Sequence, residues 1–185
     1  MILVVDMNYK KDSLGFYEFV LPVIAVAKPL GNWSVKHYLE VSDEDLSRCD
    51  GIILSGTALK DVATLNQPEK FQWLKATEKP VLGICAGMET IGTVFGTHLT
   101  RFLEIGMTPV KTVKENPLCS GGFKVYSLHS VSIKPSVDFE VWAKSTKCIQ
   151  VIKHKRKRIY GVLFHPEVRN QEILKRFIQV EKIQE

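Results

Sequence analysis

Cysteine is scarce in this chain, and its spacing excludes two classes of small protein. The 185 residues contain four cysteines, none of them in a CxxC pair. Disulfide frameworks and zinc ribbons use closely paired thiols, so neither is indicated. We therefore expect free thiols, and no metal site, at the four positions, which are Cys49, Cys85, Cys119 and Cys148.

Long apolar runs and an N-terminal signal pattern are also missing. Because a membrane span needs about 20 apolar residues, we expect a cytoplasmic protein with no membrane partner. The net charge of +5 is modest and comes mostly from a basic run at 153–158, so no nucleic-acid partner is expected. The length, with 45% hydrophobic and 24% charged residues, suits one globular domain, residues 1–185.

The first half of the chain alternates apolar strands with helical patterns. Strands are predicted at 2–5, 33–39, 51–55 and 80–84. Helices are predicted from a cap at Asp12 or Ser13 to Val26, from 42 to 48, from 68 to 78 and up to Phe95. Pro22 should kink or split the first helix. Such alternation predicts an α/β fold with a mainly parallel open sheet and helices on both faces, as in flavodoxin-like proteins.

The second half reads differently. Five short extended runs, at 98–100, 107–113, 123–129, 139–143 and 149–152, are separated by glycine, proline and serine. They predict a smaller antiparallel portion of hairpins packed against the main sheet. An amphipathic helix is expected at 170–180.

One stretch organises the chain, PVLGICAGMETIGTVF at 80–95. An apolar strand arrives at Cys85, and Gly83 and Gly87 flank this cysteine before a helical pattern begins. Such a strand, turn and helix push the cysteine side chain above the carboxyl edge of the sheet. The helix N-terminus lowers a thiol's pKa and can hold an oxyanion. Cys85 is therefore a candidate nucleophile, and the alternative is a small buried hydrophobic residue.

A second stretch supplies a base. The strand in IYGVLFHPE, at 159–167, ends at His165, and Glu167 follows two residues later. If this strand and the one before Cys85 lie in one parallel sheet, their carboxyl ends share an edge. His165 would then take the thiol proton, and Glu167 would orient the imidazole.

GICAG around Cys85 and GVLFHPE ending at Glu167 resemble the motifs of the class I glutamine amidotransferases, and the similarity spans nearly the whole chain. Within that family the chain is most similar to the stand-alone glutaminase subunits of archaeal-type GMP synthases. The resemblance implies a triad of Cys85, His165 and Glu167 that hydrolyses glutamine without a cofactor. It also implies an ammonia acceptor, which would be a separate ATP-dependent synthetase subunit.

The resemblance assigns an oxyanion role to the backbone of Ala86 and to the loop after GIILSG, where Gly56 is followed by Thr57. In the family a glycine stands where this chain has Thr57, so the loop should differ in shape or present its donor differently. The family's substrate-holding glutamine is replaced by Glu89, whose charge would raise the pKa of a nearby thiol. A solvated first-turn glutamate is the alternative for Glu89.

The resemblance also assigns substrate contacts to the loop at His129 and Ser130, which lacks the aspartate common there in the family. A structural or partner-facing histidine is the alternative for His129. The basic run at 153–158 is interpreted as a solvated hairpin tip, with a docking surface as the alternative. Because of Thr57 and Glu89, two other functions stay open. They are a binding or regulatory protein with impaired catalysis and a hydrolase of another γ-glutamyl compound.

Overall fold

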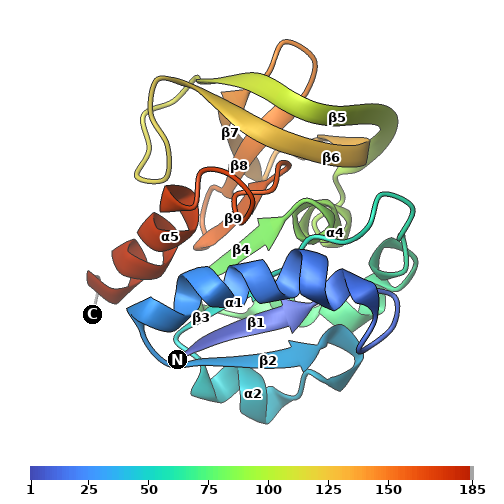
Figure 1. Ribbon diagram of the computed structural model, residues 1–185, viewed down its shortest axis with the longest axis vertical. Helices are drawn as coiled ribbons and strands as arrows, with labels where there is room; N and C mark the ends of the chain where they lie inside the picture. The colour runs from blue at the N-terminus through green and yellow to red at the C-terminus, as the bar shows by residue number, and fades with distance from the viewer. Residues whose placement is uncertain (184–185) are drawn as a thin grey trace.

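The computed structural model describes residues 1–183, and side chains up to residue 179. In this part of the chain one continuous, strongly curved sheet is flanked by helices (Figure 1). Along the sheet the strands are β2 (Trp33–His37), β1 (Ile2–Asp6), β3 (Gly51–Leu54), β4 (Val81–Ile84), β9 (Ile159–Val162), β8 (Ile149–His154), β7 (Phe139–Lys144), β5 (His98–Thr112) and β6 (Gly122–Lys134).

The first five strands in this order are mutually parallel, which confirms the predicted parallel sheet. β4 and β9 are direct neighbours although about 75 residues separate them in sequence, and Gly83 pairs with Gly161 in their ladder. Both strands therefore end at the same edge of the sheet. Ligand sites of open α/β sheets form at this edge.

Helices cover both faces of the parallel strands, as predicted. They are α1 (Leu21–Ala27), α2 (Asp43–Arg48), α3 (Trp73–Ala76), α4 (Ala86–Val94) and α5 (Glu172–Ile183). Since strand side chains alternate between faces, neighbouring residues join different cores. Val4 packs in one core with side chains of α1 and α5, whereas Val5 packs in the other with side chains of α4.

The predicted first helix is split, as Pro22 indicated. A π-helical turn, Phe16–Val20, precedes α1, and Pro22 lies in the first turn of α1, where its missing N–H is tolerated. Leu14, which lies before the π-turn, is 81% exposed. The predicted cap is wrong, because the Ser13 hydroxyl has no hydrogen-bond partner among the described residues.

Two other predicted boundaries are wrong. The strand expected at 33–39 ends at His37, because a 3₁₀ turn, Tyr38–Glu40, follows it. The helix expected at 68–78 is a 3₁₀ turn, Pro68–Phe71, followed by the short α3. Beyond α3, the hydroxyl of Thr77 accepts a hydrogen bond from the backbone N–H of Lys79, a local turn that competes with helix continuation.

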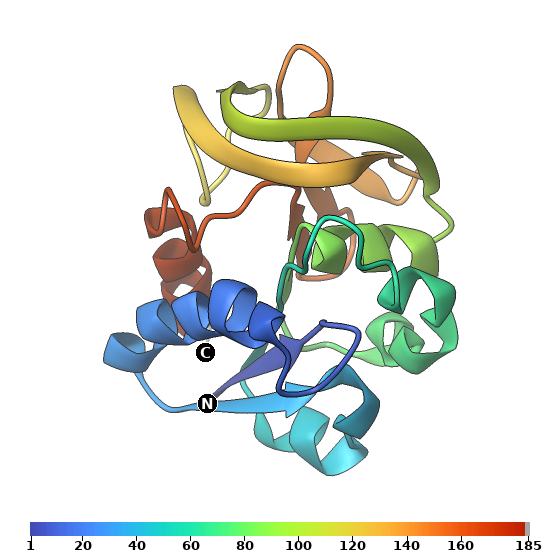
Figure 2. The ribbon, with the colours of Figure 1, turned by 45° about the vertical axis from the view of Figure 1, so that its right-hand side comes forward.

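The antiparallel portion extends the main sheet, whereas separate hairpins packed against it were predicted. β8 pairs with β9, and β7, β5 and β6 follow in antiparallel order. Two of the predicted short runs are parts of one strand, β5, which is 15 residues long with a register irregularity between Arg101 and Glu104. Figure 2 shows β5 and β6 as a curved ribbon over the carboxyl ends of the parallel strands.

The basic run at 153–158 lies at the turn between β8 and β9, at the end of the sheet opposite to the carboxyl edge. The Lys157 ammonium donates to the carboxylate of Glu78 and to the carbonyl of Thr77, both at 3.0 Å. The run is therefore partly fixed to the loop before β4. Among the described residues no helix is long and apolar enough to cross a membrane.

Candidate active site

Cys85 occupies the junction between β4 and α4, as the motif predicts. Its backbone has φ 47° and ψ −104°, a conformation that costs a non-glycine residue about 1–3 kcal/mol. The backbone N–H of Cys85 donates to the Val162 carbonyl at 2.8 Å, which ties the turn to β9. The strained turn places the thiol at the N-terminus of α4, where first-turn N–H groups lack helical partners.

The two glycines beside Cys85 allow α4 to pack closely over the sheet. A Cβ at Gly83 would lie 2.5 Å from the carbonyl carbon of Gly87. A Cβ at Gly87 would lie 2.6 Å from the carbonyl oxygen of Leu54 in β3. Since such contacts are too short for any side chain, only glycine fits at either position. Close packing of α4 fixes the position of the cysteine.

His165 lies just beyond β9, on the same sheet edge. Its Nε2 is 3.4 Å from the carbonyl oxygen of Leu128, and the Cys85 thiol donates to the same oxygen at 3.6 Å. The thiol and the imidazole are therefore neighbours. The other ring nitrogen, Nδ1, is 2.7 Å from Oε1 of Glu167, and both of these side chains are fully buried. The structure thus brings together the three residues predicted for the triad.

Burial and charge shift the pKa values of this cluster. Burial raises the pKa of the Cys85 thiol, and the neighbouring His165 opposes that rise. Burial alone would lower the pKa of His165, but Cys85 and Glu167 raise it well above its usual value. His165 is therefore a stronger base than an ordinary imidazole, which favours acceptance of the thiol proton. The carboxylate of Glu167 stabilises the imidazolium that results.

The loop after β3 packs directly against His165. A Cβ at Gly56 would lie 2.6 Å from Cε1 of the imidazole, so glycine is needed there for close approach. Thr57 does not have a positive φ; the described non-glycine residues that do are Asp12, Cys85 and Asn170. The loop has a shape that a β-branched residue accepts. The Thr57 hydroxyl donates to the carbonyl of Asp61 at 3.3 Å, which closes the loop on itself.

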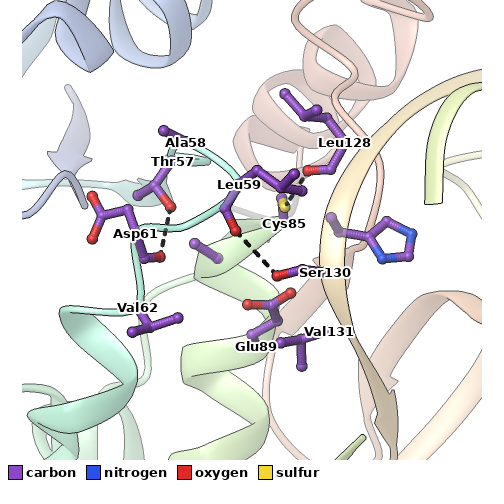
Figure 3. A pocket seen from close by; sticks show the side chains of 12 residues that line it. Thr57, Ala58, Leu59, Asp61, Val62, Cys85, Glu89, Leu128, Ser130 and Val131 are labelled. Carbon is purple, nitrogen blue, oxygen red and sulfur yellow. Dashed lines mark hydrogen bonds between the residues drawn. The ribbon is translucent and has the colours of Figure 1, made fainter. Parts of the chain in front are cut away.

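A small cavity lies between this loop, α4 and β6 (Figure 3). Thr57, Cys85, Ala86, Glu89 and Ser130 contribute to its lining. Its volume of about 10 Å³ is room for about one water molecule. The Ser130 hydroxyl donates to the carbonyl of Leu59 at 3.1 Å and so links β6 to the loop across this space.

Glu89 is a buried acid, and the solvated first-turn glutamate that was its alternative does not occur. The residue is 6% exposed, and its carboxyl points into the cavity (Figure 3). Burial raises its pKa to about 7, with His165 acting in the opposite direction. Glu89 also raises the pKa of Cys85, as the sequence predicts.

His129 borders the cavity, but its imidazole lies on the opposite face of β6. Nε2 lies 3.2 Å from Oε2 of Glu104 on β5. Ser130, the next residue along, contacts the loop at Leu59 instead. Since successive strand residues face opposite ways, the two cannot both present side chains to the cavity. This arrangement corresponds to the structural histidine that was one of the two interpretations.

The sequence did not reveal two contributors to the site. The carbonyl of Leu128 is the meeting point of the thiol and the imidazole, and a backbone group leaves no sequence signal. Asp61 orders the loop, because its carboxylate accepts hydrogen bonds from the backbone N–H groups of Tyr9 and Ala63. The sequence signal for this role is the aspartate itself, because an aspartate carboxylate often accepts a hydrogen bond from the backbone N–H two residues later, here that of Ala63.

A cysteine at a strained strand-to-helix turn, with a buried His-Glu pair beside it on an α/β sheet, is the arrangement expected of triad-type hydrolases. The family model described as "Glutamine amidotransferase class-I" matches residues 30–183. The chain belongs to the class I glutamine amidotransferases.

The sequence is similar to those of several GMP synthase subunits over much of its length. The glutamine-hydrolyzing GMP synthase subunit of Methanococcus maripaludis is 39% identical over 142 residues, which cover 71% of this chain and 73% of the relative. The protein of the same name from Methanocaldococcus jannaschii is 38% identical over 112 residues, 55% of this chain and 60% of the relative.

The fold is also similar to a solved structure. A crystal structure from Thermoplasma acidophilum, of a protein described as a putative GMP synthase subunit, superposes with a TM-score of 0.84. The match covers 100% of this chain and 96% of that one at 22% sequence identity. At this identity the likeness shows a shared fold.

Proposed function

We propose that this chain is a glutaminase that hydrolyses the side-chain amide of glutamine to glutamate and ammonia through a thioester on Cys85. One observation carries the proposal. The thiol lies at a strained strand-to-helix turn beside His165, whose far nitrogen is 2.7 Å from the buried Glu167. Membership of the class I family supports the same reaction.

The reaction proceeds in two halves. The Cys85 proton moves to His165, and the sulfur attacks the amide carbon of glutamine. The C–N bond then breaks, and the imidazolium gives its proton to the departing ammonia. In the second half His165 takes a proton from water, whose oxygen attacks the thioester carbon. The C–S bond breaks, glutamate leaves, and the thiol regains its proton.

The negative charge on the carbonyl oxygen needs donors. We assign this role to the backbone N–H of Ala86, at the start of α4, and to an N–H of the loop at Gly56 and Thr57. Preorganised N–H groups in a buried site stabilise such an oxyanion strongly, and removing one donor costs about 3–4 kcal/mol in a well-studied hydrolase. The regular φ of Thr57 supports a loop that presents its N–H without strain.

Glu89 takes the position of the family's glutamine, and its raised pKa gives it a comparable role. With a pKa of about 7, a large fraction of Glu89 is protonated near neutral pH. A protonated carboxyl donates one hydrogen bond and accepts others, as an amide does. Glu89 therefore holds the substrate as a neutral acid, and its ionised form opposes thiolate formation.

Glutamine is larger than the present cavity, so the loop at 57–62 and β6 must separate to admit it. The hydrogen bond between Ser130 and Leu59 joins these two segments. We propose that a separate ATP-dependent synthetase subunit receives the ammonia and stabilises the open form. The relatives named as GMP synthase subunits support GMP synthesis as the acceptor reaction. We place residues 1–185 in one catalytic domain that acts in the cytoplasm, where glutamine and ATP are present.

The test is ammonia release from glutamine by the isolated chain and by the chain mixed with an archaeal GMP synthase synthetase subunit, ATP and xanthosine monophosphate. We expect slow release alone and faster release in the mixture. No release in either case, with Cys85 still labelled by a glutamine-like chloroketone, would favour a regulatory protein. Release only from another γ-glutamyl compound would favour a hydrolase of that compound.

A further inference from the structure

We propose that Glu104, His129 and Cys148 form a zinc-binding site in the antiparallel half of the sheet, separate from the candidate active site. The donor atoms of these three side chains all lie within 4.8 Å of one another. They come from three different parts of the chain: β5, β6 and the turn before β8. Thiolate, imidazole and carboxylate are the three protein ligand types that Zn²⁺ takes.

The distance between the histidine and glutamate ligand atoms fits a tetrahedral ion. With metal–ligand bonds of about 2.0–2.3 Å, the ligand atoms of tetrahedral zinc are about 3.3–3.6 Å apart. Nε2 of His129 and Oε2 of Glu104 are 3.2 Å apart, and these residues are direct cross-strand partners. The sulfur of Cys148 has to approach by no more than about 1.5 Å, which a rotamer change of a cysteine side chain covers.

The local backbone holds these ligands in place. The register irregularity of β5 ends at Glu104, and such bulges commonly re-aim a side chain next to a functional site. The turn before β8 is closed by the Ser145 hydroxyl, which accepts the backbone N–H of Cys148 at 2.9 Å. Each ligand therefore stands on backbone that is already ordered.

A buried amide supplies a second, independent observation. Gln150 on β8 is fully buried, and its Nε2 donates to Oε2 of Glu104 at 3.2 Å. Its carbonyl oxygen, on the same amide group, has no hydrogen-bond partner among the described residues. Rotation of the amide by half a turn would direct this oxygen at the cluster, where it or a water would complete four ligands.

The charges favour a divalent ion. His129 would bind the ion through its neutral imidazole, as histidine ligands do. Zinc binding would release the Cys148 proton to solvent. One Zn²⁺ with one thiolate and one carboxylate then gives a net charge of zero, which suits a site in which His129 is fully buried and Glu104 is 15% exposed.

The position of the site links it to the active-site cavity. His129 lies between Leu128, whose carbonyl meets Cys85 and His165, and Ser130, which bonds the loop at Leu59. A metal on His129 would fix this part of β6 from its other face. The site would therefore stabilise the wall of the cavity without contacting the substrate.

The experiment is a titration of the metal-free full chain with Co²⁺, read by the thiolate-to-cobalt charge-transfer absorption, and with Zn²⁺ in competition. All proteins carry Cys85→Ser, so that the active-site thiol cannot contribute a band. We expect one equivalent of cobalt, displaced by zinc. Cys148→Ser should abolish the band, and the matched control Cys119→Ser, at another buried cysteine, should retain it.

Glu104→Gln preserves the shape of the cluster. It should weaken metal binding by more than about 10-fold, which is the loss expected when a residue that only bonds to a metal ligand is changed. If circular dichroism shows that Cys148→Ser does not fold, the Glu104→Gln variant tests the metal site in its place. Zinc should also raise the Tm of the Cys85→Ser protein but not that of its Glu104→Gln derivative. A band that persists in Cys148→Ser, or a folded protein that binds no metal at one equivalent, would overturn the proposal.

Discussion

Among the described residues, two clusters combine a cysteine, a histidine and a glutamate, and they differ in how the pKa of the imidazole is shifted. In the parallel half, His165 lies between Cys85 and Glu167, which both raise its pKa. In the antiparallel half, burial dominates and lowers the pKa of His129. The imidazole of the first cluster is therefore a stronger base than an ordinary histidine, and that of the second is a weaker one.

The difference comes from how each half of the sheet brings side chains together. Parallel neighbours end at one edge, so residues after β4 and β9 meet above the sheet, beside a helix N-terminus and a loop. Antiparallel neighbours meet through register, so Glu104 and His129 face each other across β5 and β6. Composition alone therefore does not define a catalytic triad; the location on the sheet does.

The sharpest way to break this comparison is to remove each thiol in turn. Cys85→Ala should lower kcat/KM for glutamine by about 10⁴–10⁶-fold, because a nucleophile has no substitute. The loss of kcat/KM in Cys148→Ala should be smaller than that in Cys85→Ala by a factor of at least about 10³. Cys119→Ala serves as the buried-cysteine control. Ammonia release measures all three. Equal losses for Cys85 and Cys148 would mean that the wrong cluster has been assigned to catalysis.

The second comparison is between the carboxylates of the two clusters, Glu167 and Glu104. Glu167→Gln should lower kcat/KM by about 10²–10⁴-fold, because the amide no longer stabilises the imidazolium at Nδ1, 2.7 Å away. It should also shift the pH dependence of kcat/KM, since Glu167 raises the pKa of His165. Glu104→Gln is the matched carboxylate change in the other cluster. An identical pH profile for Glu167→Gln and the wild type would contradict the role of Glu167.

The buried acid Glu89 should make stability depend on pH. Its pKa of about 7 lies above the ordinary 4.5, so the folded state holds this proton more tightly than the unfolded state. The stabilisation is present at low pH and is lost as pH rises from about 4.5 to about 7. Relative to the wild type, Glu89→Gln should gain about 2–3 kcal/mol of unfolding free energy between pH 5 and pH 8.

Urea unfolding of both proteins at the two pH values measures this difference. Since Glu89→Gln restores the residue of the family, it should also remain active, with less inhibition of thiolate formation above neutral pH. A stability difference that does not change with pH would show that Glu89 is not perturbed.

The smallest effect compares one glycine from each half. Gly56→Ala would place a Cβ 2.6 Å from His165, so we expect a loss of about 1–3 kcal/mol in stability and a further loss of kcat/KM. Gly122→Ala, on β6, meets only the Val110 carbonyl oxygen at 4.0 Å and should change stability by less than about 0.5 kcal/mol. Thermal unfolding of the pair measures both. Equal Tm values would remove the argument for close approach at Gly56.

The sequence was sufficient for the strand-turn-helix at Cys85 and for the edge that it shares with His165, because both follow from local patterns of strand and helix. An apolar strand, two glycines and a helical pattern predict the turn at Cys85, and a strand that ends in His165 predicts the shared edge. The same reasoning failed where geometry depends on distant contacts. A π-turn precedes α1, and 3₁₀ turns shorten two predicted elements.

The second cluster could not be predicted from sequence for the same reason. Glu104 and Cys148 are 44 residues apart, and their meeting depends on a bulge in β5 and on the curl that brings β8 under the hairpin. Neither leaves a compositional signal. Likewise, the burial that raises the pKa of Glu89 follows from how the 57–62 loop and β6 close over α4.

Covalent labelling by a glutamine-like chloroketone, located by mass spectrometry of peptides from the intact-labelled chain, tests the central claim most directly. We predict one equivalent on Cys85, prevented by excess glutamine and slowed by Glu167→Gln. Labelling of Cys148 or Cys119 in preference to Cys85, or labelling of Cys85 that glutamine does not slow, would contradict the account.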